Sequence, residues 1–388
     1  MRIKALSFHV LILILTAGQL CAAETNAAIN VFSHFDSAVL PGDYTVEGNT
    51  ITFDLQDPSH FHLFVLLEGP QKKLCVQLKF DKKHITWFQD WGLFVSKDEK
   101  KYDCIPYTKV DEQTLQCEVD MSGGRLFVAT TLPYGRDNFD ELLMQTSGCG
   151  RWKLIRYRGR SVPIFEIGRD DGKKPIHFFA GEDARETPGI WLADSMIRVL
   201  CENRDLAKRL TEKYVIRICP TISLYSLTAE HSSFTDMNGN SYYGGGSWNK
   251  QNLQPEMAVI YNLVEETIKQ KRLGFFMTFH SSFSYTPPPA VETVRTAGEN
   301  TLSEERAAWA MKTMETIMED THNPALRIRV ADKAWIDGVL RAVLLDRFNA
   351  ATFRIEEPTQ TREGYKKTAE KMLTNLARVH DWTPVLEP

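Results

Sequence analysis

The chain has 388 residues, of which 43% are hydrophobic and 25% are charged, and its formal net charge at pH 7 is −4. This composition is typical of a globular protein, and the length exceeds one ordinary domain, so we expect two domains with substantial cores. The slightly negative charge and the absence of a long basic run argue against nucleic acid as a partner.

The first 23 residues have the pattern of a signal peptide. A short positive region at Arg2 and Lys4 precedes a mostly apolar run over residues 6–16. The small residues of Cys21-Ala22-Ala23 then offer a cleavage site. We therefore expect a secreted or periplasmic protein whose mature chain begins near Glu24. No later stretch is apolar and long enough to span a bilayer.

The cysteines suit an exported chain. Of the 7 cysteines, Cys21 lies in the leader and the others are Cys75, Cys104, Cys117, Cys149, Cys201 and Cys219. An even number after export permits disulfides, and we predict the pair Cys104–Cys117 first because the two flank an expected hairpin. Cys219 lies in an apolar strand and is expected to be a buried free thiol.

Short alternating apolar runs fill the chain from Ile29 to about Leu132. Turn residues such as Asp57-Pro58, Gly69-Pro70 and Gly123-Gly124 separate these runs. Regularly spaced short strands of this kind predict a β-sandwich of roughly 100 residues. We therefore place a first domain at residues 24–132 and a second at residues 133–388. In the second, strands interleave with amphipathic helices as in α/β proteins.

The segment from Lys174 to Gly189 has the pattern of a buried strand, a tight turn and the start of a helix. Three charged residues, Asp183, Arg185 and Glu186, lie in that turn. Open α/β sheets build their sites at the carboxyl ends of strands, which makes these side chains candidates for chemistry. A solvated turn with three charges is the alternative interpretation.

Three motifs resemble those of the carboxypeptidase A-like zinc metallocarboxypeptidases. The turn Gly181-Glu182-Asp183-Ala184-Arg185-Glu186 resembles the zinc-binding turn of that family, with aspartate in place of its first histidine. Phe275 to Ser282 resembles the strand ending in Asp-x-His-Ser, and Thr352 to Glu356 resembles the strand ending in the catalytic glutamate. An N-terminal sandwich followed by Leu132-Pro133-Tyr134 is similar to the cytosolic-carboxypeptidase subfamily. The resemblance implies an N-terminal β-sandwich followed by a carboxypeptidase-like α/β/α domain with a mixed central sheet.

The resemblance implies a Zn2+ site with Asp183, Glu186 and His280 as ligands, because zinc hydrolases use three protein ligands and an open position. Glu356 would be the general base that takes a proton from water. Aspartate in place of a neutral imidazole adds negative charge, which should change both the zinc affinity and the acidity of the water. Taken alone, His280 also fits a packed strand histidine, and Glu356 a solvated strand end.

The family's residues for gripping substrate are largely replaced. Its Asn-Arg pair, which holds a peptide's terminal carboxylate, falls on Gly245-Gly246, and only Trp248 survives from that motif. No arginine lies between Ile218 and Lys271 to stand for the family's oxyanion-stabilising arginine. Hydrolysis needs a donor of this kind, since stabilising the developing charge usually contributes more to catalysis than any other single effect.

Three arginines remain as candidates for substrate binding. Arg185 matches the family's arginine in the zinc-binding turn, and Arg341 stands where the family places its side-chain specificity residue. Arg354 precedes Glu356 by two residues and therefore shares its strand face. Arg341 and Arg354 together predict a pocket for a carboxylate side chain. The alternative for Arg341 is the exposed face of a helix.

The first functional hypothesis is an exported zinc-dependent carboxypeptidase-like hydrolase that removes a C-terminal residue from a peptide substrate. We favour a terminal residue with an acidic side chain. The second is a metal-free pseudoenzyme that binds a peptide or glycan-peptide. The third is an amidohydrolase or deacylase acting on a small amino-acid derivative. Zinc content separates the second hypothesis from the other two, and substrate size separates the first from the third. The sequence leaves the oligomeric state open.

Overall fold

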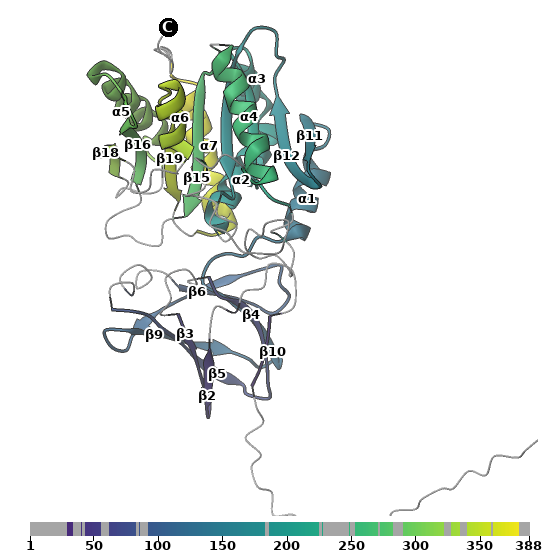
Figure 1. Cartoon of the computed structure of the whole chain (residues 1–388). Helices are drawn as coiled ribbons and strands as arrows, with labels where there is room; N and C mark the ends of the chain where they lie inside the picture. The colour runs from purple at the N-terminus through teal and green to yellow at the C-terminus, as the bar shows by residue number, and fades with distance from the viewer. Residues whose placement is uncertain are drawn as a thin grey trace, which may run out of the picture.

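The computed structural model describes residues 29–33, 40, 43–55, 62–82, 85, 92–182, 186–224, 227, 248, 253–270, 272–281, 290–321, 327–333, 340–357 and 360–379. The expected signal peptide at residues 1–23 lies outside them. Figure 1 shows two bodies, a smaller all-β body and a larger one in which helices cover a central sheet. None of the described helices is both long and apolar enough to cross a membrane.

The smaller body is the predicted β-sandwich. Its first sheet contains, in order, β1 (Asn30–Phe32), β4 (Phe64–Glu68), β10 (Arg125–Ala129), β6 (Gly92–Ser96) and β7 (Asp103–Pro106). Its second sheet contains, in order, β2 (Tyr44–Glu47), β3 (Thr50–Asp54), β5 (Lys73–Lys79), β9 (Thr114–Asp120) and β8 (Thr108–Lys109). Alternate residues of β5 are buried, as the sequence pattern predicts for a strand with one face on a core. Residues from both sheets, such as Val76 and Val128, share one apolar cluster.

The larger body is built on one mixed sheet, as expected. Its main path runs β11 (Arg151–Tyr157), β12 (Arg160–Ile167), β14 (Tyr214–Cys219), β13 (Lys174–Ala180), β15 (Phe275–Ser281), β19 (Phe353–Glu357), β16 (Ala290–Ala297) and β17 (Asn300–Thr301). A further strand, β18 (Arg327–Lys333), pairs with β16. The four central strands β14, β13, β15 and β19 are parallel, while β12 and β16 run antiparallel to their neighbours in this group. The carboxyl ends of the central strands therefore meet at one edge.

Helices cover both faces of this sheet. One face packs against α1 (Arg136–Thr146), α2 (Thr187–Glu202), α3 (Arg204–Thr211), α5 (Glu304–Met318) and α7 (Arg362–Leu376). The other packs against α4 (Pro255–Lys269) and α6 (Leu340–Phe348). Successive residues of β13 show the division, because Phe178 belongs to the first cluster and Phe179 to the second. Strands buried on both faces require the continuous apolar runs seen in the sequence.

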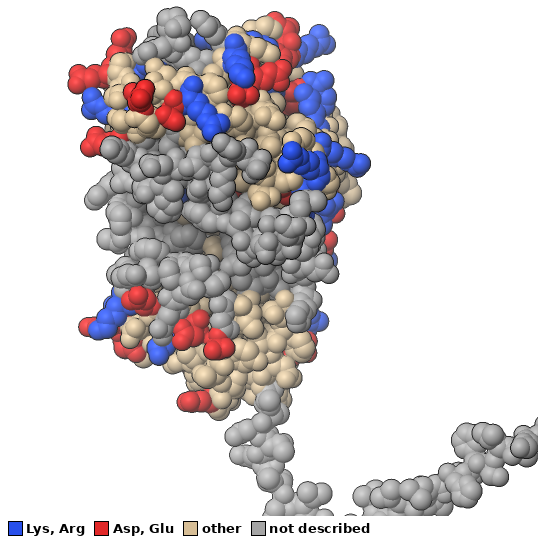
Figure 2. Space-filling view, in the orientation of Figure 1, with Lys and Arg blue, Asp and Glu red and all other residues tan. Residues whose placement is uncertain are grey.

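The outer strand β11 carries positive charge. Arg151 and Arg156 are exposed, and Lys153 is half-buried. Figure 2 shows Lys and Arg side chains gathered on the side of the larger body where Figure 1 places β11 and β12. Charged side chains on an edge strand discourage pairing with the edge of another molecule.

The disulfide prediction is wrong. The bond joins Cys149, after α1, to Cys201 near the end of α2, and Cys104 and Cys117 are free thiols. The physical reason is that these two do not flank one hairpin. Cys104 lies on β7 of the first sheet and Cys117 on β9 of the second. Cys219 is a buried free thiol, as predicted.

Candidate active site

The segment after β13 is shaped by two glycines. Gly181 has φ of +71°, and a Cβ there would come within 2.9 Å of Thr221 Oγ1, so the sharp turn that ends the strand requires glycine. A Cβ on Gly189 would lie 2.5 Å from the backbone oxygen of Phe279. Glycine therefore lets the first turn of α2 approach the end of β15. Glu186, the N-cap residue of α2, is brought beside His280 in this way.

His280 lies between two glutamates at the carboxyl end of β15. Its Nε2 is 2.9 Å from Oε2 of Glu182, and its Nδ1 is 2.7 Å from Oε2 of Glu186. The other oxygen of Glu182 accepts a hydrogen bond of 2.6 Å from the indole Nε1 of Trp248. All four side chains are buried. Residues distant in sequence thus converge on one small, buried polar cluster.

Electrostatics in this cluster favour a charged imidazole when no metal is bound. Burial and the charge of Arg354 lower the pKa of His280, but Glu186 and Glu182 outweigh them and raise it to about 10. Burial also raises the pKa of Glu182, but the charge of His280 and its hydrogen bond outweigh burial and lower it. An imidazolium held by two carboxylates is the arrangement that compensates these buried charges.

The predicted base is adjacent to His280 through strand register. His280 of β15 pairs with Glu356 of β19, and Thr278 pairs with Arg354. Arg354 and Glu356 are two residues apart on β19, so the two positions lie on the same face of the strand. The side chain of Glu356 lies outside the described residues, whereas Arg354 is half-buried. Arg354 acts electrostatically on both Glu182 and His280, which places its charge near the cluster.

The remaining predicted residues are only partly described. Asp183 and Arg185 lie outside the described residues, between Glu182 and Glu186. The backbone of Arg341 is in α6, and its side chain lies outside the described set. Of the predicted set, the structure therefore brings together Glu186, His280 and, by backbone register, Glu356.

Sequence reasoning missed Glu182. It occupies the variable position of the motif, and nothing in local sequence distinguishes it from a solvated turn residue. Trp248 was noted as the survivor of a motif, but its partner was not predicted.

The donor atoms of Glu186 and His280 fit a zinc site. Oε2 of Glu186 is buried and accepts no hydrogen bond among the described residues, and it lies close to an imidazole nitrogen. Carboxylate and imidazole are the ligand types that zinc takes in hydrolases. Within the part of the chain that the structure describes, no three His, Cys, Asp or Glu side chains form a group that could hold a metal ion. The third predicted ligand, Asp183, falls outside that part.

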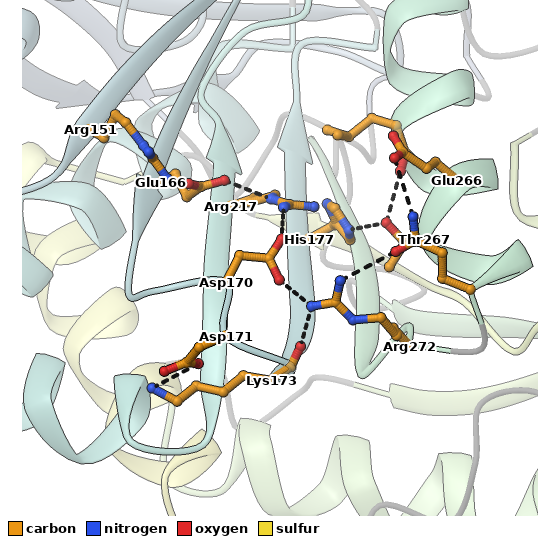
Figure 3. Close-up of polar contacts among 12 residues, drawn as sticks. Arg151, Glu166, Asp170, Asp171, Lys173, His177, Arg217, Glu266, Thr267 and Arg272 are labelled. Carbon is orange, nitrogen blue, oxygen red and sulfur yellow. Dashed lines mark hydrogen bonds and ion pairs between the residues drawn. The ribbon is translucent and has the colours of Figure 1, made fainter.

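A separate cavity of ≈240 Å3 lies on the α4 face, near the amino end of β13. Figure 3 shows Arg217 between the carboxylates of Glu166 and Asp170, with Arg272 on the far side of Asp170. Lys153 also donates to Glu166, at 2.7 Å. Burial raises the pKa of Glu166, but Lys153 and the arginines outweigh it and lower the value to about 2. These cations and carboxylates compensate one another, so we interpret the cluster as a structural network.

Comparison with solved structures identifies the fold. A metallo-carboxypeptidase from Burkholderia cenocepacia matches with a TM-score of 0.73 and 13% identity, over 90% of this chain and 98% of that one. A metallo-carboxypeptidase from Pseudomonas aeruginosa, in complex with (2-guanidinoethylmercapto)succinic acid, matches with a TM-score of 0.72 and 14% identity over the same shares. No protein-family model matches the sequence, and no curated protein does. The coverage extends over sandwich and sheet alike, and the chain has the fold of the metallocarboxypeptidases, in a divergent form.

Proposed function

We propose that this chain is an exported zinc-dependent carboxypeptidase-like hydrolase that removes a C-terminal residue with an acidic side chain from a peptide. The observation that carries the proposal is the approach of Glu186 Oε2 to His280 Nδ1, at 2.7 Å, where two parallel strands end. Glu356 occupies the register position beside His280. This juxtaposition of two ligand types and a carboxylate base suits hydrolysis.

Metal binding and proton transfer would be carried out by different residues of the chain. Asp183, Glu186 and His280 would hold the zinc ion, which when bound polarises the scissile carbonyl and acidifies water. Glu356 would accept the proton released by the attacking water and pass it to the leaving amine. Buried surroundings make the charges in this cluster act more strongly than they would in water.

Arg185, Arg341 and Arg354 would hold the substrate's carboxylates. Arg185 follows a proposed ligand closely in the sequence, and the charge of Arg354 reaches the cluster. A guanidinium can grip a carboxylate through two parallel hydrogen bonds. The Pseudomonas structure, whose ligand is a substituted succinic acid, supports carboxylate ligands for this fold.

The metal-free binding protein is the second candidate, and one observation favours it. Both ring nitrogens of His280 lie within 2.9 Å of carboxylate oxygens, so an imidazolium can compensate the charge of both glutamates without a metal. In that case the fold would present a peptide-binding surface without hydrolysis.

Metal analysis of purified wild type and His280→Ala tests the proposal. We expect about one zinc per wild-type chain after reconstitution, loss of zinc in the variant, and a melting temperature that rises with zinc only in wild type. His177→Ala, which removes another buried histidine of the same sheet, is the control and should keep its zinc. A wild type that takes up no zinc would favour the binding protein.

A further inference from the structure

We propose that Glu182 is a positioning residue that orients His280 for metal binding, and that Trp248 holds Glu182 in place. This inference rests on the proposed function. It concerns residues that the zinc-binding motif does not include, since Glu182 stands at the motif's variable position.

The two oxygens of Glu182 have different donors. Oε2 is 2.9 Å from Nε2 of His280, and Oε1 accepts the indole N–H of Trp248 at 2.6 Å. The exposed fractions of Glu182, His280 and Trp248 are 5%, 3% and 0%. A buried carboxylate with one donor on each oxygen has a fixed orientation, because rotating it would leave a buried polar atom unsatisfied.

This orientation determines which ring nitrogen of His280 can bind the metal. With a hydrogen on Nε2 donated to Glu182, the neutral ring presents the lone pair of Nδ1 to the side where Glu186 Oε2 lies. Metal-ligating histidines generally donate their other ring N–H to a carboxylate or carbonyl, which fixes the tautomer and raises the basicity of the ligating nitrogen. Glu182 has the geometry of that carboxylate.

The same geometry argues against Glu182 as a metal ligand itself. Both of its oxygens already accept from buried donors, and exchanging either donor for a metal would leave Trp248 or His280 unsatisfied. Glu186, by contrast, has an oxygen that accepts no hydrogen bond among the described residues. The two glutamates therefore have separate tasks, with Glu186 binding and Glu182 orienting.

The experiment is a double-mutant cycle on zinc affinity. Glutamine at position 182 offers one acceptor to two donors, so either His280 or Trp248 loses its partner. We expect Glu182→Gln to weaken zinc binding by about 10- to 100-fold, the range for such outer partners. Trp248→Phe removes one donor and should weaken binding less. In the double variant the glutamine oxygen is available to His280 alone, so part of the affinity should return.

A second readout is the Nε2–H hydrogen of His280, observed by 15N NMR of histidine-labelled, zinc-loaded protein. We expect this hydrogen to exchange slowly with solvent in wild type, where Glu182 accepts it, and faster in Glu182→Gln. Glu256→Gln is the matched control, because Glu256 is another buried glutamate, and its described partners are Ser223 and Arg160. Its zinc affinity and histidine spectrum should equal those of wild type.

The outcomes separate the two proposals. A wild type that binds no zinc overturns the proposed function, and the positioning role falls with it. If wild type binds zinc and Glu182→Gln binds it equally well, the function stands and the positioning role is overturned. Should Glu182→Gln fail to fold, Trp248→Phe decides, since unchanged zinc affinity and an unchanged exchange rate of the Nε2–H hydrogen in that variant would also overturn the inference.

Discussion

The hydroxyl of Tyr134 donates a hydrogen bond of 2.9 Å to Oδ2 of Asp194, joining the segment that follows the sandwich to helix α2. Both residues are buried. The indole N–H of Trp191, one turn earlier on α2, donates to the backbone oxygens of Leu132 and Pro133. The Tyr134 and Trp191 rings pack edge to face at 4.7 Å. The connection between the two bodies is therefore anchored on the helix that also carries Glu186 at its start.

Tyr134→Phe should lower the free energy of unfolding by about 1.5 to 3 kcal/mol, the range for a hydrogen bond to a charged group. Burial raises the pKa of Asp194, and losing the hydroxyl would leave Arg198 as the remaining donor described for that carboxylate. Urea denaturation measures the change. Tyr157→Phe, at an exposed position, is the control and should stay within about 0.5 kcal/mol of wild type. Equal stability of all three proteins would show that the hydroxyl contributes nothing.

The Cys149–Cys201 bond encloses a large segment, with a sequence separation of 52 residues. Constraining a loop of that length in the unfolded chain stabilises the fold by up to about 4 kcal/mol in the chain-entropy model. Cys149→Ser should lose most of this, as should wild type in a reducing agent. Cys104→Ser, which changes an exposed free thiol, is the control. A melting temperature insensitive to the reducing agent would contradict the prediction.

The architecture was predictable because it rests on local patterns. Alternation in the first part of the chain and continuous apolar runs such as Phe275 to Phe279 report burial on one or both faces of a sheet. The disulfide was not predictable in this way, because Cys104 and Cys117 are near in sequence but lie on different sheets. Pairing depends on how strands are distributed between sheets, which no local pattern records.

The residues of the site likewise include some that local sequence predicts and one that it does not. Glu186 and His280 were predicted because they occupy motif positions, and their convergence follows from β13 and β15 being parallel neighbours. Glu182 depends on contacts to residues 66 and 98 positions away in the sequence. Its role arises from tertiary packing around Gly181, so the sequence alone left it as one more charge in a turn.

The buried His177 should make the free energy of unfolding fall as the pH is lowered. Burial and, less strongly, the charge of Arg217 together lower its pKa to about 3, against a weaker opposing effect of Glu166. Its Nε2 is 3.2 Å from Thr267 Oγ1 on α4, beside Glu266 (Figure 3). The folded state thus keeps this ring neutral, while the unfolded chain binds a proton below about pH 6.5. The stabilisation that results from the lowered pKa of His177 is fully present above that pH and is lost as the pH falls toward 3.

Unfolding free energies of wild type and His177→Leu measured from pH 7 to pH 4 check this effect. Wild type should lose more stability per pH unit below pH 6 than the variant, with the difference approaching about 1.4 kcal/mol per unit. Other titrating groups contribute equally to both proteins, so the difference in slope isolates His177. Parallel pH profiles would mean that folding does not lower the pKa of His177.

Arg354 provides the test of substrate class. It is half-buried on β19, paired with Thr278 of β15 on one side and Glu292 of β16 on the other. If its guanidinium grips a substrate carboxylate, Arg354→Thr should lower kcat/KM for a glutamyl-ended peptide by about 1.5 to 3 kcal/mol. A leucyl-ended peptide should be spared. Arg354→Lys keeps the charge but loses the paired hydrogen bonds, so its loss should be intermediate.

The competing role of Arg354 predicts a different pattern. Its charge already lowers the pKa values of Glu182 and His280, so it can also act by steadying the cluster whatever the substrate. In that case Arg354→Thr would reduce kcat/KM equally for glutamyl-ended and leucyl-ended peptides and would change zinc affinity as well. Measuring both substrates together with zinc affinity therefore separates recognition of an acidic side chain from support of the metal site, and equal losses would overturn the proposed acidic specificity.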